Sequence, residues 1–195
     1  SIIAADLVVL ATGIRPNIEL AQAAGLATNR GITVNERLQT SNADIYAAGD
    51  VIEIEDVAIG RRACSATWFN AVLQGRFAAY NMVGRHRSYS DAVGIQNAVQ
   101  FHHVPAISFG QTLVGLESTE GFEVMTLEQD GVYKKLVLQD NKLRGMIFVG
   151  DIAKAGFYAA VIRHRLDISK VKTKLLDDDF SYAYMFQDHQ FGQRT

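Results

Sequence analysis

The chain has 195 residues, with 19 lysines and arginines against 21 aspartates and glutamates, and a formal net charge of −2. This length predicts one large domain or two small ones. The balanced charge argues against a nucleic-acid-binding protein, and a single cysteine excludes an intrachain disulfide framework and argues against a thiolate metal site. No run approaches the roughly 18 apolar residues of a membrane span. We therefore expect a cytoplasmic protein that binds neither nucleic acid nor membrane.

The first predicted element is a strand over residues 7–10, whose continuous Leu-Val-Val-Leu run is typical of strands buried on both faces. The chain enters this run after only six residues and without an initial methionine. We therefore expect a chain that starts inside a structural element, either after processing or as a fragment. Further along, the pattern predicts a turn at residues 15–17 and a short helix at residues 18–24 that is closed by Gly25. It then predicts a strand start at residues 31–34 and a second buried strand at residues 44–48.

A longer helix is predicted over residues 65–83, with Ser65 or Thr67 as its N-cap. Apolar side chains recur there at three- and four-residue spacing and predict one apolar face, formed by Ala66, Phe69, Val72, Leu73, Phe77 and Tyr80. The polar, basic residues 84–88 interrupt the pattern. We interpret them as a solvated linker and place the domain boundary after residue 86.

The remaining chain has a β-rich texture. Five short runs separated by Gly, Asn or Asp predict strands at residues 104–109, 113–116, 122–127, 132–138 and 143–149. Residues 139–142 (Gln-Asp-Asn-Lys) predict a hairpin turn. A helix is expected over residues 152–165, capped by Asp151, with Ala155, Tyr158, Ala159 and Ile162 on its buried stripe.

The most informative position is the end of the predicted strand 44–48, where Gly49 precedes Asp50. A glycine there allows close approach of a ligand or of another backbone, and open α/β sheets bind ligands at the carboxyl ends of their strands. Asp50 is suited to accept hydrogen bonds from a sugar-like hydroxyl, without any proton transfer. A plain turn remains the alternative.

Residues 11–17 (ATGIRPN) and 46–50 (YAAGD), in this order and at this separation, resemble the pyridine nucleotide-disulfide oxidoreductase family of flavoproteins. Residues 70–76 (NAVLQGR) are similar to the helix that follows in that family. The resemblance is strong over about the first 85 residues. The remainder more loosely resembles the family's C-terminal interface domain, especially in the branch of NADH oxidases, NADH–rubredoxin reductases and the large subunit of assimilatory nitrite reductase.

The resemblance implies an α/β plus α+β fold. Residues 1–86 would be the end of a Rossmann-like FAD/NAD(P)-binding domain, and residues 87–195 a mixed β-sheet interface domain with helices. It implies that Asp50 contacts the ribityl chain of FAD and that the start of the helix after residue 67 faces the flavin ring, where helix N-termini favour negative charge. The candidate cofactor-binding residues are Thr12, Gly13, Gly49, Asp50, Thr67, Trp68 and Phe69. Trp68 alternatively serves only for packing at the helix start.

The two Gly-x-Gly-x-x-Gly fingerprints of this family do not occur here, and its redox cysteine has no match. We therefore expect a C-terminal portion of a longer FAD-dependent NAD(P)H oxidoreductase that is inactive by itself. It would form homo-oligomers through residues 87–195 and pass electrons to an acceptor that the sequence does not identify. The alternative is a non-catalytic interaction or dimerisation module with the same architecture and no bound flavin.

Other reactive side chains carry weaker signals. Cys64 precedes a helix start, where a thiolate is stabilised, but a buried structural cysteine is the preferred interpretation. The pair His102-His103 has no third ligand at metal-binding spacing, and no suitable acid follows His189. We therefore predict no catalytic residue and no metal site. The aromatic tail, with Tyr182, Tyr184, Phe186 and Phe191, is expected to pack on its own domain or on a dimer partner.

Overall fold

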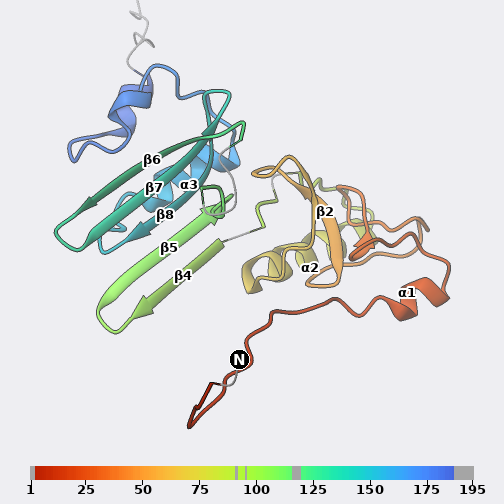
Figure 1. Ribbon diagram of the computed structural model, residues 1–195. Coiled ribbons are helices and arrows are strands. Elements are labelled where there is room, and N and C mark those ends of the chain that lie inside the picture. Colours follow the sequence, from red (N-terminus) through yellow and green to blue (C-terminus); the bar gives the residue numbers. More distant parts are fainter. Residues whose placement is uncertain (1–2, 91, 95, 116–119, 187–195) are drawn as a thin grey trace, which may run out of the picture.

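The computed structural model describes residues 3–90, 92–94, 96–115 and 120–186. Two sheets dominate them, a small three-stranded sheet beside helix α2 and a five-stranded antiparallel sheet that carries helix α3 on one face (Figure 1). Two separate clusters of buried hydrophobic residues accompany these sheets. Among the described residues, no helix is long and apolar enough to cross a membrane.

The strand predicted at residues 7–10 is wrong. Residues 7–10 belong to no strand, and Leu10 is 85% exposed. A strand buried on both faces must belong to a sheet that is covered on both faces, and no strand pairing among the described residues includes this segment. The short helix that follows is confirmed as α1 (Glu19–Ala23), and Gly25 adopts a left-handed φ of 71° just beyond the end of the helix.

The small sheet has the order β1-β2-β3 and consists of β1 (Ile32–Thr33), β2 (Ile52–Asp56) and β3 (Arg61–Ala63). β1 runs parallel to β2, and β2 runs antiparallel to β3. The strand start at residues 31–34 is confirmed, but the buried strand at 44–48 is wrong. That segment forms only a single bridge between Tyr46 and Gln39, because no neighbouring strand continues the ladder.

Helix α2 (Trp68–Met82) confirms the predicted helix, and the Thr67 side chain caps it by accepting a hydrogen bond from the Asn70 amide. Its predicted apolar face is confirmed only in part, because Leu73 and Phe77 pack against the core of the small sheet but stay partly exposed. The side chains buried on α2 are Asn70, Gln74, Ala78 and Asn81, whereas Phe69 and Val72 are about half exposed. Tertiary hydrogen bonds, described below, bury the polar stripe instead.

The five-stranded sheet has the order β4-β5-β8-β7-β6 and is antiparallel throughout. Its strands are β4 (Gln96–Phe101), β5 (Val104–Gly110), β6 (Glu123–Gln129), β7 (Val132–Gln139) and β8 (Lys142–Val149). Four predicted strands are thus confirmed, and so is the β7–β8 hairpin turn. The strand predicted at 113–116 is wrong over its described part, residues 113–115, because the chain turns there away from β5.

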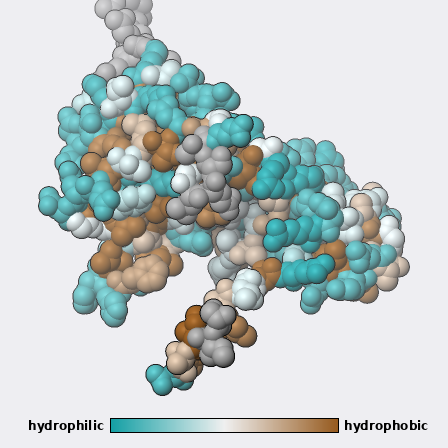
Figure 2. Space-filling view, in the orientation of Figure 1, coloured by the Kyte–Doolittle hydropathy of each residue, from teal (hydrophilic) through white to brown (hydrophobic). Residues whose placement is uncertain are grey.

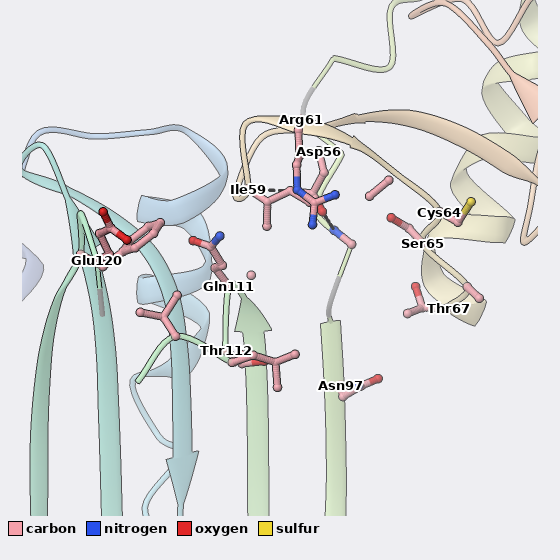
Figure 3. Close-up of a pocket in the computed structure, with 17 residues that line it drawn as sticks. Asp56, Ile59, Arg61, Cys64, Ser65, Thr67, Asn97, Gln111, Thr112 and Glu120 are labelled. Carbon is pink, nitrogen blue, oxygen red and sulfur yellow. Dashed lines mark hydrogen bonds between the residues drawn. The ribbon is translucent and has the colours of Figure 1, made fainter. Parts of the chain in front are cut away.

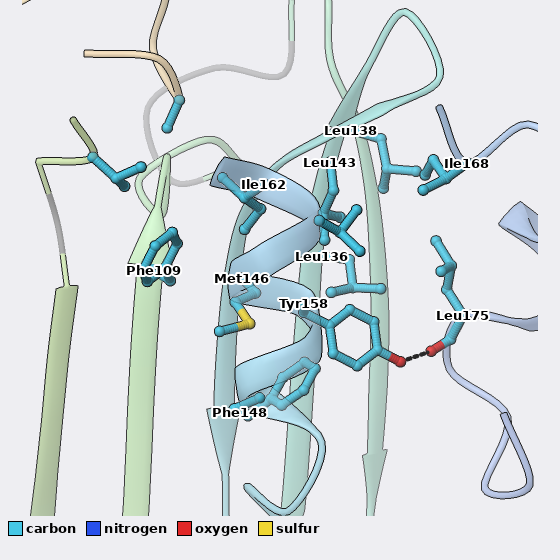
Figure 4. Packing of buried hydrophobic residues seen from close by; sticks show 14 of the residues in the cluster. Phe109, Leu136, Leu138, Leu143, Met146, Phe148, Tyr158, Ile162, Ile168 and Leu175 are labelled. Atoms are coloured by element: carbon cyan, nitrogen blue, oxygen red, sulfur yellow. Dashed lines mark hydrogen bonds between the residues drawn. The ribbon is translucent and has the colours of Figure 1, made fainter. Parts of the chain in front are cut away.

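Helix α3 (Ala155–Arg163) packs on this sheet, and the core between them contains Leu136, Met146, Phe148 and Tyr158 (Figure 4). The helix is shorter than predicted, and Asp151 does not cap it. Lys154 occupies the N-cap position instead, and the Asp151 carboxylate lies 2.6 Å from Lys134 Nζ and accepts a hydrogen bond from the Ala153 amide.

Two short 3₁₀ segments complete the described chain, η1 (Lys172–Lys174) and η2 (Tyr182–Phe186). The Tyr158 hydroxyl donates to the Leu175 carbonyl and so ties the segment before η2 to α3 (Figure 4). Tyr184 packs against the core of the five-stranded sheet, as predicted for the tail, whereas Tyr182 is largely exposed. Phe191 and His189 lie outside the described residues.

Candidate functional site

Helix α2 holds several loops through its buried polar stripe. The Asn81 side chain donates to the Arg37 and Arg87 carbonyls and accepts from the Arg87 amide. Gln74, fully buried, accepts a hydrogen bond from the Gly49 amide at 2.8 Å. Since an amide side chain both donates and accepts, this stripe can hold backbone segments in place that an apolar stripe could not.

The Gly49–Asp50 turn is therefore fixed against α2. Gly49 has a φ of 86°, a left-handed conformation that favours glycine. A Cβ added there would meet only Ala71, at 3.9 Å, so the backbone lies beside α2 and is otherwise open. Asp50 itself is exposed. The predicted ligand position is thus a carboxylate on a fixed turn next to the start of α2.

Two adjoining cavities lie around this turn and the start of α2. The small cavity has a volume of about 260 Å³ and includes Ile14, Pro16 and Asp50 in its wall. The large cavity measures about 560 Å³ and includes Thr67. Both cavities share Arg61, Ala63, Cys64 and Ala66 as wall residues. The segment from β3 to α2 therefore separates two spaces that together surround the N-terminus of the helix.

The large cavity opens between the two sheets. Figure 3 shows Asp56, Arg61 and Ser65 on the side of the small sheet and Gln111, Thr112 and Glu120 on the side of the five-stranded sheet. The Ser65 hydroxyl and the side-chain oxygen Oε1 of Gln111 are buried and have no hydrogen-bond partner among the described residues. Buried polar atoms usually find a partner, which marks this wall as suited to a polar ligand atom or to water.

Asp56 is the buried acid of the large cavity. Its carboxylate accepts hydrogen bonds from the amides of Ala58 at 2.8 Å and Gly94 at 2.7 Å. Burial raises the pKa of Asp56, and these amides, with that of Ile59 and the charge of Arg61, offset part of the rise. The carboxylate thus connects the β2–β3 turn to the segment leading into β4.

The first turn of α2 exposes large apolar side chains together with backbone donors. Trp68 is 87% exposed. The first amides of a helix have no carbonyl partner within the helix, and the positive end of the helix dipole lies there. This combination suits a flat apolar ligand whose edge accepts hydrogen bonds or carries negative charge.

The predicted site residues come together only in part. Asp50 reaches the small cavity beside Ile14 and Pro16, so the two motif segments do meet. Thr12 and Gly13 lie on the exposed N-terminal segment and line neither cavity. Gly49 contacts α2, and Thr67 caps it, while Trp68 and Phe69 project from its first turn without lining either cavity.

The weaker candidates remain without a site. Burial and the nearby charge of Glu53 raise the pKa of Cys64, so its thiol is not activated. His102 and His103 lie in the exposed β4–β5 turn. Within the described ranges, no group of three His, Cys, Asp or Glu side chains is placed to hold a metal ion.

Sequence reasoning missed Glu53, a buried carboxylate in the wall of the small cavity. It accepts hydrogen bonds from the amides of Arg30 at 3.1 Å and Gly31 at 3.3 Å and from the Asn29 side chain at 3.2 Å. The alternating Ile-Glu-Ile-Glu-Asp sequence of β2 carries a strand signal. Glu53 was missed because the strand predictions in this region relied on continuous apolar runs, which β2 does not have.

Comparison with known proteins identifies relatives for most of the chain. Residues 1–75 match the family model described as pyridine nucleotide-disulphide oxidoreductase. The chain is 33% identical to nitrite reductase [NAD(P)H] of Bacillus subtilis over 86% of its own length and 20% of that protein. It is 34% identical to the assimilatory nitrate reductase electron transfer subunit of the same organism, over 91% of the chain and 22% of the relative. Residues 1–75 belong to the pyridine nucleotide-disulfide oxidoreductase family.

Solved structures agree with this assignment. An FAD-dependent pyridine nucleotide-disulphide oxidoreductase from Desulfovibrio vulgaris superposes with a TM-score of 0.74 at 26% identity, over 88% of this chain and 45% of that one. The NADH:rubredoxin oxidoreductase of Clostridium acetobutylicum superposes with a TM-score of 0.62 at 26% identity, over 90% of this chain and 42% of that one. The chain spans about a fifth of the length of the two Bacillus relatives.

The residues of this chain fit part of an FAD site. Gly49 leaves open space where any other residue would place a Cβ, Asp50 offers an exposed carboxylate beside it, and the first turn of α2 offers amides. Asp50 lines the small cavity and Thr67, the cap of α2, lines the large one. The described residues thus provide acceptors for hydroxyl groups and donors for an electron-rich ring edge.

Proposed function

We propose that this chain forms part of an FAD-dependent NAD(P)H oxidoreductase and supplies contacts to the ribityl chain and the ring of the flavin. The observation that carries the proposal is the hydrogen bond from the Gly49 amide to Gln74, which fixes the Gly49–Asp50 turn beside the start of α2. Asp50 and Thr67, which are 17 residues apart in sequence, thereby line two adjoining cavities on either side of the segment that leads into α2.

Asp50 accepts hydrogen bonds from ribityl hydroxyls in this proposal. A carboxylate acts only as an acceptor, so Asp50 would orient the cofactor through its oxygens. Thr67 caps the first turn of α2, and the amides of Trp68 and Phe69 would serve as donors to the electron-rich edge of the ring. Bound FAD would supply the hydride-transfer chemistry, and the protein supplies orientation and electrostatics. The helix N-terminus favours the negative charge of a reduced flavin.

The five-stranded sheet would form a subunit interface. Its edge strand β4 is exposed along nearly its whole length and presents the side chains of Val99 and Phe101, and Val104 at the start of the neighbouring strand β5 is also exposed. Figure 2 shows hydrophobic surface over the β4–β5 hairpin. An exposed apolar edge strand is a typical site for association with another chain. The division into residues 1–86 and 87–195, the electron acceptor and the cytoplasmic location remain predictions.

Substitution of Asp50 tests the cofactor role. Asp50→Ala removes a charged acceptor, worth about 1.5–3 kcal/mol, and should weaken FAD binding by roughly 10- to 150-fold. Asp44→Ala, which changes another exposed aspartate nearby, should leave binding unchanged. Trp68 is the only tryptophan, so quenching of its fluorescence during FAD titration reports binding directly at the start of α2.

FAD binding also decides between a flavoprotein and the alternative, a non-catalytic interaction or dimerisation module. FAD binding that is equal in wild type and Asp50→Ala would contradict the role of Asp50. If neither this chain nor the natural full-length protein retains FAD after dialysis, the chain is better described as an interaction or dimerisation module.

A further inference from the structure

A chain of side-chain hydrogen bonds, partly buried at Arg163 and Gln96 and fully buried at Asn70, joins α3 to the first turn of α2. The Arg163 guanidinium, at the end of α3, donates to Gln96 Oε1 at 2.9 Å. Gln96, at the start of β4, donates through Nε2 to Asn70 Oδ1 at 2.8 Å. Asn70, in the first turn of α2, donates through Nδ2 to the Val93 carbonyl at 2.9 Å. We call this chain the Arg163–Gln96–Asn70 relay.

The direction of the relay is set by its two ends. An arginine can only donate hydrogen bonds, and a backbone carbonyl can only accept them. Gln96 must therefore turn its oxygen toward Arg163 and its NH₂ group toward Asn70, and Asn70 must turn its NH₂ group toward Val93. Every bond runs the same way, an arrangement in which neighbouring bonds polarise and strengthen one another.

Burial makes this relay costly to break. Asn70 is fully buried, and the hydroxyl of the buried Tyr89 donates to the same Asn70 oxygen at 3.3 Å. A buried polar group that loses its partner incurs a desolvation cost larger than the net gain of the bond itself. The Asn70 side chain, and with it the first turn of α2, is consequently confined to one position.

Arg163 reaches the same turn by a second route. Its guanidinium lies 6.0 Å from the centre of the Phe69 ring and 5.5 Å from that of Phe109 in β5. Both distances are within the range of cation–π attraction. Arg163 therefore contacts two consecutive residues of α2. It reaches Phe69 by cation–π attraction to the phenyl ring, and Asn70 through the hydrogen bonds of Gln96.

We propose that Arg163 and Gln96 are positioning residues for the flavin site. Acting through Asn70 and Phe69, they fix the first turn of α2 and thus the direction of the amide donors at its N-terminus. The predicted effect on flavin binding rests on the proposed function, since only there do these amides contact the flavin ring. Its structural part, the control of the α2 turn by the five-stranded sheet, holds independently and can be measured without flavin.

Hydrogen exchange tests the structural part in this chain without any cofactor. The Ala71 amide, bonded to the Thr67 carbonyl at 3.0 Å, reports the first turn. We expect Arg163→Ala and Gln96→Ala to accelerate its exchange about tenfold, the effect of losing one charge-assisted hydrogen bond. The Met146 amide in the sheet core should be unchanged, which shows that the variants fold. Arg76→Ala, at an exposed arginine on α2, is the matched control and should leave Ala71 unchanged.

Two conservative variants separate the relay from simple packing. Arg163→Lys retains a donor and a charge, so it should restore most of the protection of Ala71. Gln96→Glu can still accept from Arg163 but has no donor for Asn70, so it should loosen the turn as much as Gln96→Ala. Wild-type exchange at Ala71 in Gln96→Glu, or in Arg163→Ala, would overturn the relay.

FAD titration with Trp68 fluorescence then tests the consequence. Arg163→Ala and Gln96→Glu should weaken FAD binding about tenfold, again the effect of losing one charge-assisted hydrogen bond. Arg163→Lys should retain most of the wild-type affinity. Loosened Ala71 with unchanged FAD affinity would refute the positioning role while leaving the proposed function intact. Absence of FAD binding to the wild type and to the natural full-length protein would instead refute the proposed function, and the exchange data would still decide the relay.

Discussion

Adding one methyl group at Gly49 tests whether the turn that carries Asp50 has the conformation described here. Gly49 has a φ of 86°, and an added Cβ would meet only Ala71, at the comfortable distance of 3.9 Å. The cost of Gly49→Ala therefore comes from the backbone conformation alone, about 1–2 kcal/mol. The Gly49–Gln74 hydrogen bond holds the turn in place at 2.8 Å. If the turn relaxes and that bond is lost, about 1 kcal/mol more is expected.

Gly75 provides a matched control on the neighbouring helix. It lies inside α2 without a left-handed φ, and a Cβ there would meet nothing within 4 Å. Gly75→Ala should therefore stabilise the protein by about 0.5–1 kcal/mol through helix propensity. Urea unfolding curves measure both changes, and FAD titration should show weaker binding only for Gly49→Ala. A Gly49→Ala variant as stable as wild type would show that the turn is not left-handed and would remove the geometric basis for the role of Asp50.

Two further predictions concern the large cavity and the five-stranded sheet. Because burial raises the pKa of Asp56, the folded state binds its proton more tightly than the unfolded chain. Stability should consequently fall as the pH rises from the usual value of 3.8 through the raised folded value. In Asp56→Asn this pH-dependent loss should disappear from urea midpoints measured between pH 4 and 7, and an identical slope in both proteins would contradict the burial argument. In Gly145→Ala, a Cβ would lie 2.0 Å from the Gln111 carbonyl oxygen. The backbone must move, so a loss of at least about 3 kcal/mol is expected in thermal unfolding, whereas Gly156→Ala, with open space around it, should cost little.

The five-stranded sheet was the most predictable part of the fold. In β7 and β8, apolar residues occupy both faces of a central pair of strands, and the Asp140-Asn141 turn between them adopts the two left-handed conformations typical of a tight hairpin. Such signals are local, since neighbouring residues determine them. Strand β4 was not predicted, because Val99 and Phe101 are its only large apolar residues and two such residues are too few for a strand signal.

Elements defined by distant partners were the ones predicted wrongly. Residues 7–10 and 44–48 have the composition of buried strands, but a strand exists only where another strand pairs with it, and composition does not reveal the partner. At the candidate site, the residues that could be located from the sequence were those in short motifs, Gly49, Asp50 and Thr67. Glu53 and the unpaired Gln111 became visible only when the fold placed them beside the two cavities.

Helix α2 shows why the site itself needed the structure. Hydrophobic periodicity assumes that the apolar stripe of a helix is the buried one, yet here the buried stripe contains Asn70, Gln74 and Asn81. Each of these amides holds a segment from elsewhere in the chain, and none of those hydrogen bonds leaves a trace in local sequence. The apolar residues are divided along the same helix. Leu73 and Phe77 pack against the core of the small sheet, whereas Trp68 and Phe69 in the first turn are exposed. Hydrophobic periodicity alone does not distinguish these two groups, and only the fold shows that the exposed apolar side chains gather at the N-terminus of the helix.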